Sequence, residues 1–116
     1  DVTVSRGLGD VYKRQEIYPY VTEGIGEDMI PKNINFDIID GFTKVTDKDA
    51  AIFCRELLKK EGMFLGNSAG AAIKGVLQLK ENFKPEDLVV VLFHDHGSRY
   101  LKKIYNDDWM SKMGYM

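Results

Sequence analysis

The sequence predicts an α/β fold with three layers around a mostly parallel sheet. β-rich and helical stretches alternate along the chain from Asp37 to Met113. This order is typical of helices that cover the faces of a sheet. The stretch from Leu88 to Phe93 is continuously apolar, as expected for a parallel strand that is buried on both faces.

Composition narrows the classes of protein to which the chain can belong. Its 116 residues are 44% hydrophobic and 29% charged, a balance typical of globular domains. The net charge is −2 and no basic run is present, so we expect no nucleic-acid or membrane partner. No apolar run approaches the ~20 residues of a transmembrane helix. The single Cys54 excludes an internal disulfide and favours a cytoplasmic protein.

The first segment, Asp1 to Gln15, differs from the rest. It has two glycines, two arginines and little apolar periodicity, so we expect no element beyond a possible short strand. It also resembles translated adapter sequence, and an ordinary mobile N-terminus is the alternative. We expect Asp1 to Gln15 to be non-native or disordered and poorly packed. The domain then runs from Glu16 to Met116.

The clearest predicted helix follows Thr46. Thr46 can cap it, and Asp49 occupies the capping-box position, where Glu or Gln is usual. Gly62 is expected to end the helix. Apolar residues recur at helical spacing and predict one buried face, made of Ala50, Phe53, Cys54, Leu57 and Leu58.

Shorter elements complete the prediction. "MFL", from Met63 to Leu65, is a candidate short strand, and a second helix is expected to begin near Ser68 and stop before Pro85. Two more helical stretches are expected, over Gly97 to Tyr105 and over about Asp107 to Met113. Asn106 or Asp107 can cap the last one.

The segment Gly66-Asn67-Ser68-Ala69-Gly70 matches G-x-S-x-G, the pattern of the nucleophile elbow in serine hydrolases. The same turn can instead bring a serine hydroxyl close to a cofactor. A hydrolase needs a histidine and an acid beside the serine, and the order Ser68, Asp95, His96 fits superficially. In an extended strand, however, Asp95 and His96 point to opposite faces, which disfavours the hydrolase.

Two further patterns are candidate ligand sites, the histidine pair and the glycine pair. His94 and His96 share a face if the chain is extended, but a catalytic zinc normally has three protein ligands, so we expect no metal. Gly24 and Gly26 are not part of a dinucleotide fingerprint, because Met29 stands where its third glycine is required. They form either a tight turn or a close backbone approach to a ligand.

Four motifs, taken together and in this order, carry a family resemblance: "EGIGEDMIP", "VTDKDAAIFCRELLKKEGMFLGNSAG", "VVVLFHDHGSRY" and "YNDDWM". From Glu16 to Met116 the chain resembles the C-terminal half of the catalytic domain of bacterial-type cystathionine β-synthases and cysteine synthases. These are fold-type-II enzymes (tryptophan synthase β-like) that depend on pyridoxal 5'-phosphate. The resemblance implies that residues 16–116 are the C-terminal part of such a catalytic domain.

The resemblance also implies roles for particular residues. In this family the serine at the position of Ser68 donates its hydroxyl to the pyridine nitrogen of the cofactor. Gly66, Gly24 and Gly26 would be cofactor-binding residues, with Gly66, Ala69 and Gly70 keeping the approach to the ring open. Neither His94 nor His96 is then expected within hydrogen-bond reach of Ser68.

The implied reaction replaces the β-substituent of serine, or of an activated serine, by homocysteine to give cystathionine. A cysteine synthase that uses sulfide is the nearest alternative. A serine hydrolase and a non-catalytic α/β module are more distant ones. Small amino acids are the implied substrates, and the full-length enzyme is expected to be a homodimer.

One component of the family's site is not predicted in this chain. The family attaches its cofactor to a lysine in the N-terminal half of the domain. None of Lys59, Lys60 or Lys74 has the context of that lysine. We therefore assign no catalytic residue here and expect this chain alone to be inactive.

Overall fold

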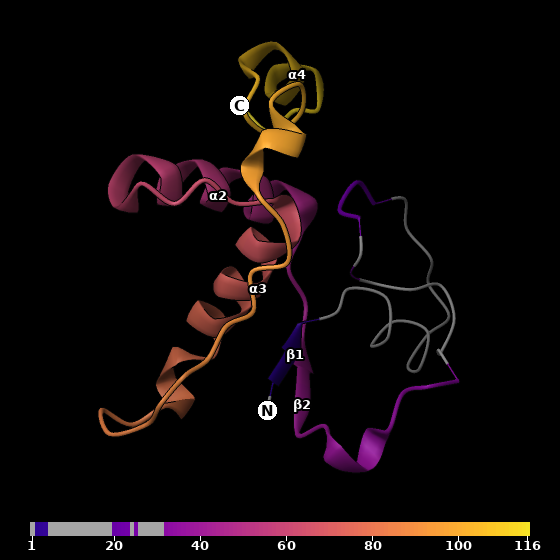
Figure 1. The fold of residues 1–116 in the computed structure, drawn as a ribbon, viewed down its shortest axis with the longest axis vertical. Coiled ribbons are helices and arrows are strands. Elements are labelled where there is room, and N and C mark those ends of the chain that lie inside the picture. The colour runs from indigo at the N-terminus through magenta and orange to yellow at the C-terminus, as the bar shows by residue number, and fades with distance from the viewer. Residues whose placement is uncertain (1, 5–19, 24, 26–31) are drawn as a thin grey trace.

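The computed structural model of the chain describes residues 2–4, 20–23, 25 and 32–116. Figure 1 shows two crossing helices, α2 and α3, with a small sheet beside α3 and a short C-terminal helix, α4. The strands are β1 (Val2–Val4) and β2 (Gly41–Thr43), and the helices are α2 (Asp47–Glu61), α3 (Asn67–Gln78) and α4 (Asp107–Lys112). Three short 3-10 helices complete the described elements: η1 (Phe36–Ile38), η2 (Lys80–Asn82) and η3 (Gly97–Tyr100).

The two strands of the described residues pair in parallel, with Val2 opposite Gly41 and Val4 opposite Thr43. This pairing agrees with the predicted parallel α/β class. β1 also contacts α3, and it is the short strand that was considered possible in this segment; that Asp1 to Gln15 is non-native or disordered stays a prediction. Asp1 and the stretch from Ser5 to Gln15 lie outside the described residues.

Helix α2 begins and ends where the sequence predicts. The Thr46 hydroxyl accepts a hydrogen bond from the Asp49 amide at 3.0 Å and donates one to Oδ2 of Asp49 at 2.8 Å. The first bond satisfies the Asp49 amide, one of the free backbone donors at the start of the helix, and the second bond joins the two side chains. At the other end Gly62 has φ of 69°, a left-handed conformation that glycine adopts without a steric cost.

The buried face of α2 differs from the prediction. Ala51 is fully buried, whereas Phe53 is only partly buried and Leu58 is 37% exposed. The helix packs on two sides at once, against α3 and against the C-terminal segment, so the buried stripe is displaced towards Ala51. The resulting core consists of Ala51, Cys54, Tyr100, Ile104 and Met110.

The apolar stretch from Leu88 to Phe93 is not a strand. Leu88 is 90% exposed and Val90 84% exposed, which contradicts the prediction of burial on both faces. A strand needs neighbours to pair its backbone groups, and in the described part of the chain nothing pairs with this stretch. It runs back from the far end of α3 towards the start of that helix (Figure 1).

Three smaller predictions have mixed outcomes. The strand expected at "MFL" is reduced to one antiparallel bridge between Leu65 and His96. The helix expected over Gly97 to Tyr105 is the short η3 followed by turns. The last helix is confirmed as α4, and Asn106 caps it by accepting from the Trp109 amide at 2.8 Å. No helix in the described ranges is long and apolar enough to span a bilayer.

Candidate functional site

Ser68 lies in the first turn of α3, as predicted. Gly66 is the N-cap of the helix, and Ser68 is 5% exposed. The extended backbone of Gly66 turns directly into the helix, so Ser68 stands at the positive end of the helix dipole. The position agrees with either role that the sequence suggested for this serine, nucleophile or cofactor contact.

The chain brings residues from four segments around Ser68. The Gly66 amide donates to the Asp95 carbonyl at 3.0 Å, and the Gly97 amide donates to the Phe64 carbonyl at 2.9 Å. These bonds hold the stretch after Phe93 against the start of α3. An open cleft of about 350 Å³, here called the Ser68 cleft, is lined by Glu23, Ser68, His94, Asp95, Arg99, Tyr100 and Lys103.

His94 comes closer to Ser68 than we expected. Its Nδ1 is 3.5 Å from the Ser68 hydroxyl oxygen, so the expectation that neither histidine reaches Ser68 is wrong for His94. His96 is directed elsewhere: its Nδ1 is 3.0 Å from the Ser98 hydroxyl, and its ring stands edge-on to Phe64.

The catalytic triad of a hydrolase is not assembled. The carboxylate of Asp95 accepts a hydrogen bond from the Tyr100 hydroxyl at 2.7 Å. No carboxylate of the described residues is hydrogen-bonded to His94 or His96. A histidine that acts as a base for serine needs such an acid to orient it.

The glycines of the motif are required for packing. A Cβ at Gly66 would stand 1.7 Å from Oδ1 of Asp95, and a Cβ at Gly70 would stand 2.3 Å from Sγ of Cys54. Gly66 thus admits the Asp95 side chain, and Gly70 admits the close approach of α2 to α3. The other two predicted cofactor-binding residues, Gly24 and Gly26, lie outside the described residues.

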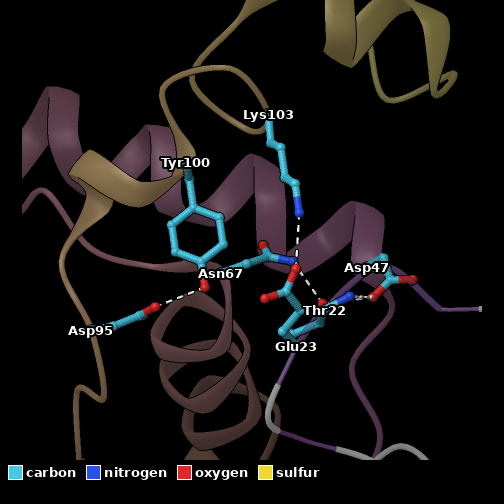
Figure 2. Close-up of polar contacts among 7 residues, drawn as sticks. All are labelled: Thr22, Glu23, Asp47, Asn67, Asp95, Tyr100 and Lys103. Carbon is cyan, nitrogen blue, oxygen red and sulfur yellow. Dashed lines mark hydrogen bonds and ion pairs between the residues drawn. The ribbon is translucent and has the colours of Figure 1, made fainter.

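A buried polar network connects the segment before Gly24 to both helices (Figure 2). Oδ1 of Asp47 accepts from the Thr22 hydroxyl at 2.6 Å and from the Thr22 amide at 3.1 Å. Nδ2 of Asn67 donates to the Thr22 hydroxyl at 2.6 Å. Next to this network, Lys103 and Glu23 form an ion pair of 2.9 Å.

Sequence reasoning missed the residues of this network and the cationic side of the cleft. Neither Asp47 nor Thr22 was predicted as a site residue, and Thr22 stands 25 positions before Asp47. An acidic residue in the first turn of a helix is common because it interacts favourably with the helix dipole, so Asp47 gave no sign of a distant partner.

The surroundings of Tyr100, Cys54 and Glu23 shift the pKa values of these three groups. Burial, followed by the hydrogen bond to Asp95, raises the pKa of Tyr100 to about 12, so Tyr100 remains a hydrogen-bond donor. Burial raises the pKa of Cys54 to about 11, which keeps it a thiol. The hydrogen bond from Lys103 holds the pKa of Glu23 below its ordinary value.

Across residues 2–4, 20–23, 25 and 32–116, no group of three His, Cys, Asp or Glu side chains could hold a metal ion. The two histidines contact different partners, since His94 lies near Ser68 and His96 near Ser98.

The chain is similar in sequence to a known enzyme family and to several characterised proteins. Residues 2–95 match the profile of a family described as pyridoxal-phosphate-dependent enzyme. The chain is 37% identical over 97 residues to a cystathionine beta-synthase of Dictyostelium discoideum, covering 84% of this chain and 20% of that protein. It is also 37% identical over 95 residues to an N-(2-amino-2-carboxyethyl)-L-glutamate synthase of Ralstonia nicotianae, covering 82% and 28%.

Solved structures show the same fold. An O-acetylserine-dependent cystathionine beta-synthase from Helicobacter pylori superposes with a TM-score of 0.74 at 33% identity, covering 90% of this chain and 34% of that one. An O-ureido-L-serine synthase superposes with a TM-score of 0.77 at 24% identity, covering 95% and 37%. The predicted fold class is thereby confirmed. The chain spans between 20% and 37% of the length of these four relatives.

Proposed function

Because this chain belongs to the pyridoxal-phosphate-dependent enzymes, we propose that the intact protein replaces the β-substituent of serine, or of an activated serine, by a thiol. Homocysteine is the proposed thiol and cystathionine the product. The relatives named as cystathionine beta-synthases support this choice. The observation that carries it is the Ser68 hydroxyl at the first turn of α3, lining a cleft of about 350 Å³.

The described residues fit the cofactor at this point. Ser68 would hold the pyridine nitrogen of pyridoxal phosphate by donating its hydroxyl hydrogen. The only hydrogen bond found for that hydroxyl among the described residues is the long contact with His94. The bound cofactor would supply an electron sink at the α-carbon of the amino-acid substrate.

The two acids of the Ser68 cleft do not compete with Ser68 for this role. Oδ2 of Asp95 is engaged by Tyr100, and Oδ1 is buried against Gly66. Glu23 is paired with Lys103. A neutral hydroxyl does not hold a pyridine nitrogen protonated as a carboxylate does, so the ring is a milder electron sink. That property suits elimination and addition at the β-carbon.

The nearest rival is a cysteine synthase, in which sulfide takes the place of the thiol. The described residues include no contact that distinguishes these two nucleophiles. We further propose that the protein is a cytoplasmic homodimer with small amino-acid substrates and that this chain alone is inactive. A serine hydrolase is the second candidate, favoured only by the 3.5 Å approach of His94 to Ser68.

The test uses the intact protein that carries this chain. It is supplied with pyridoxal phosphate, then with serine or O-acetylserine, and with either homocysteine or sulfide, and the products are quantified. We expect cystathionine as the main product and a loss of about tenfold or more in turnover in Ser68→Ala. Thr43→Val, which removes an exposed hydroxyl outside the cleft, is the control. Cysteine as the main product would support the synthase, and a protein that binds no cofactor would contradict both.

A further inference from the structure

Three polar side chains, buried together, form what we call the Thr22 network: Thr22, Asp47 and Asn67. They are 5%, 7% and 3% exposed, respectively. The Thr22 hydroxyl donates to Asp47 at 2.6 Å, the length of a hydrogen bond to a charged acceptor. Asn67 donates to the same hydroxyl at 2.6 Å, and the Thr22 amide donates to Asp47 at 3.1 Å. Asp47 also accepts from the Val21 amide at 2.8 Å. Bonds of this length between buried groups hold their partners in one arrangement.

The chemistry of the groups sets the direction of every bond in the network. An ionised carboxylate can only accept, so the Thr22 hydroxyl must donate its single hydrogen to Asp47. The hydroxyl is then left with lone pairs alone, and Asn67 must direct its amide nitrogen towards it. The bonds therefore run in one order, from Asn67 to Thr22 to Asp47, and the Thr22 hydroxyl is hydrogen-bonded to the first residue of each helix.

The network connects two parts of the proposed cofactor site. Asn67 directly precedes Ser68 in the first turn of α3, and Asp47 begins α2. Thr22 stands two positions before Gly24. On the other side of Gly24, Ile25 packs against Val45, Ala50 and Ala71. Thr22 and Ile25, which flank Gly24 in the sequence, are thus both held against the helices, and the Thr22 hydroxyl accepts a hydrogen bond from the residue before Ser68 (Figure 2).

The neighbouring ion pair is a weaker tie. The Glu23 and Lys103 side chains are 71% and 43% exposed, and pairs so exposed contribute little to stability. The side chains of the Thr22 network are buried, so water cannot replace the hydrogen bonds that they would lose. Oδ1 of Asn67 already has no hydrogen-bond partner among the described residues. Removing the Thr22 hydroxyl would leave the whole Asn67 amide without one, free to turn and to disturb the adjoining Ser68.

We propose that Thr22 and Asn67 are positioning residues: they set the first turn of α3, and with it the Ser68 hydroxyl, relative to the backbone that precedes Gly24. They act through Ser68 and do not themselves touch the cofactor. The part of this inference that concerns the cofactor rests on the proposed function. The part that concerns the two backbone segments stands without it.

The experiment compares Thr22→Val, which keeps the shape of the side chain and removes the hydroxyl, with Thr22→Ser, which keeps the hydroxyl and removes the methyl group. Thr43→Val is the matched control, because the Thr43 hydroxyl donates to Oε1 of Gln78 at 2.8 Å on the surface. In the intact protein we expect Thr22→Val to weaken pyridoxal phosphate binding about tenfold and to shift the absorption of the bound cofactor. Thr22→Ser and Thr43→Val should keep wild-type values.

Hydrogen exchange supplies a readout that needs no cofactor. The Ala69 and Gly70 amides donate to the Gly66 carbonyl at 3.1 Å and 3.3 Å and report on the first turn of α3. We expect their exchange to be about tenfold faster in Thr22→Val, with unchanged exchange in Thr43→Val. If Thr22→Val does not fold, Asn67→Ala removes the same link from the other end and should give the same shifts.

The outcomes separate this inference from the proposed function. A wild-type protein that binds no pyridoxal phosphate would contradict the function, while the exchange measurement would still decide the inference. Exchange in Thr22→Val and Asn67→Ala equal to wild type would overturn the inference. So would a cofactor spectrum and affinity that stay unchanged in both variants while only the global stability falls, because that result indicates a purely structural role.

Discussion

The Ser68 hydroxyl oxygen lies 3.5 Å from Nδ1 of His94. This distance exceeds the 2.7–3.2 Å range of ordinary nitrogen–oxygen hydrogen bonds, so His94 is near Ser68 without being firmly bonded to it. Activation of a serine needs a base held in place by an acid. Asp95, the acid next to His94 in sequence, is instead engaged by Tyr100 at 2.7 Å. His94 therefore lies beside Ser68, but it is not oriented to activate Ser68 as a nucleophile.

The first prediction follows from this geometry. A fluorophosphonate probe, which labels activated serines, should not label Ser68 in the intact protein, because no oriented base withdraws its proton. The measurement is mass spectrometry of the peptide that contains Ser68, with a serine hydrolase as positive control. Labelling that disappears in Ser68→Ala and in His94→Gln would establish the hydrolase instead.

Gly70→Ala should destabilise the protein by about 1–3 kcal/mol, because overpacking between two helices forces them apart. The new Cβ would stand 2.3 Å from Sγ of Cys54 and 2.6 Å from the Ala50 carbonyl. Gly41→Ala is the matched control, since a Cβ there meets nothing within 4 Å. Chemical denaturation measures both variants. Equal stability of the two would show that α2 and α3 are not packed as described.

Cys54 should react slowly with iodoacetamide at neutral pH in the folded protein. It is fully buried, burial raises its pKa to about 11, and the thiolate is the reactive form. The rate is followed by mass spectrometry of the peptide that contains Cys54, with and without denaturant. Modification in the native state as fast as in the denatured state would contradict the burial.

Helix ends and the site's central serine could be predicted from the sequence because the signals are local. Thr46, Asp49 and Gly62 satisfy the ends of α2 within a few residues of chain, and G-x-S-x-G places Ser68 at a helix start. The Thr22 network could not be predicted, because Thr22 and Asn67 are 45 positions apart and meet only after α2 and α3 have packed. The strand predicted from Leu88 to Phe93 was wrong for a related reason. An apolar pattern indicates that residues are buried, but it does not identify the segments that bury them.

Tyr100→Phe should destabilise the protein by about 1–3 kcal/mol at neutral pH, because Asp95 loses its donor while it remains partly buried. The pKa of Tyr100 is raised from 10 to about 12 in the folded state. A raised pKa gives a stabilising contribution that is complete below pH 10 and is lost as the pH rises to about 12. The wild-type advantage should therefore shrink over that window. Denaturation at several pH values measures it, and a constant difference would contradict the assigned pKa.

The last prediction concerns Val90, which is 84% exposed in this structure although it stands in the middle of an apolar run. Such a run is typical of a strand buried on both faces, and the chain covers only 34% of the Helicobacter pylori relative. We expect the intact protein to bury Val90 between neighbouring strands. Val90→Asp should then cost about 3 kcal/mol or more, because it buries an unpaired charge.

The control is Val90→Ile, which keeps the apolar character of the strand and should cost less than about 1.5 kcal/mol. Urea denaturation of the intact protein measures both variants. A substitution on a solvent-exposed surface usually changes stability by less than about 0.5 kcal/mol. A value that small for Val90→Asp would mean that Val90 is exposed in the intact protein as well. The run from Leu88 to Phe93 would then need a partner other than the sheet of its own domain.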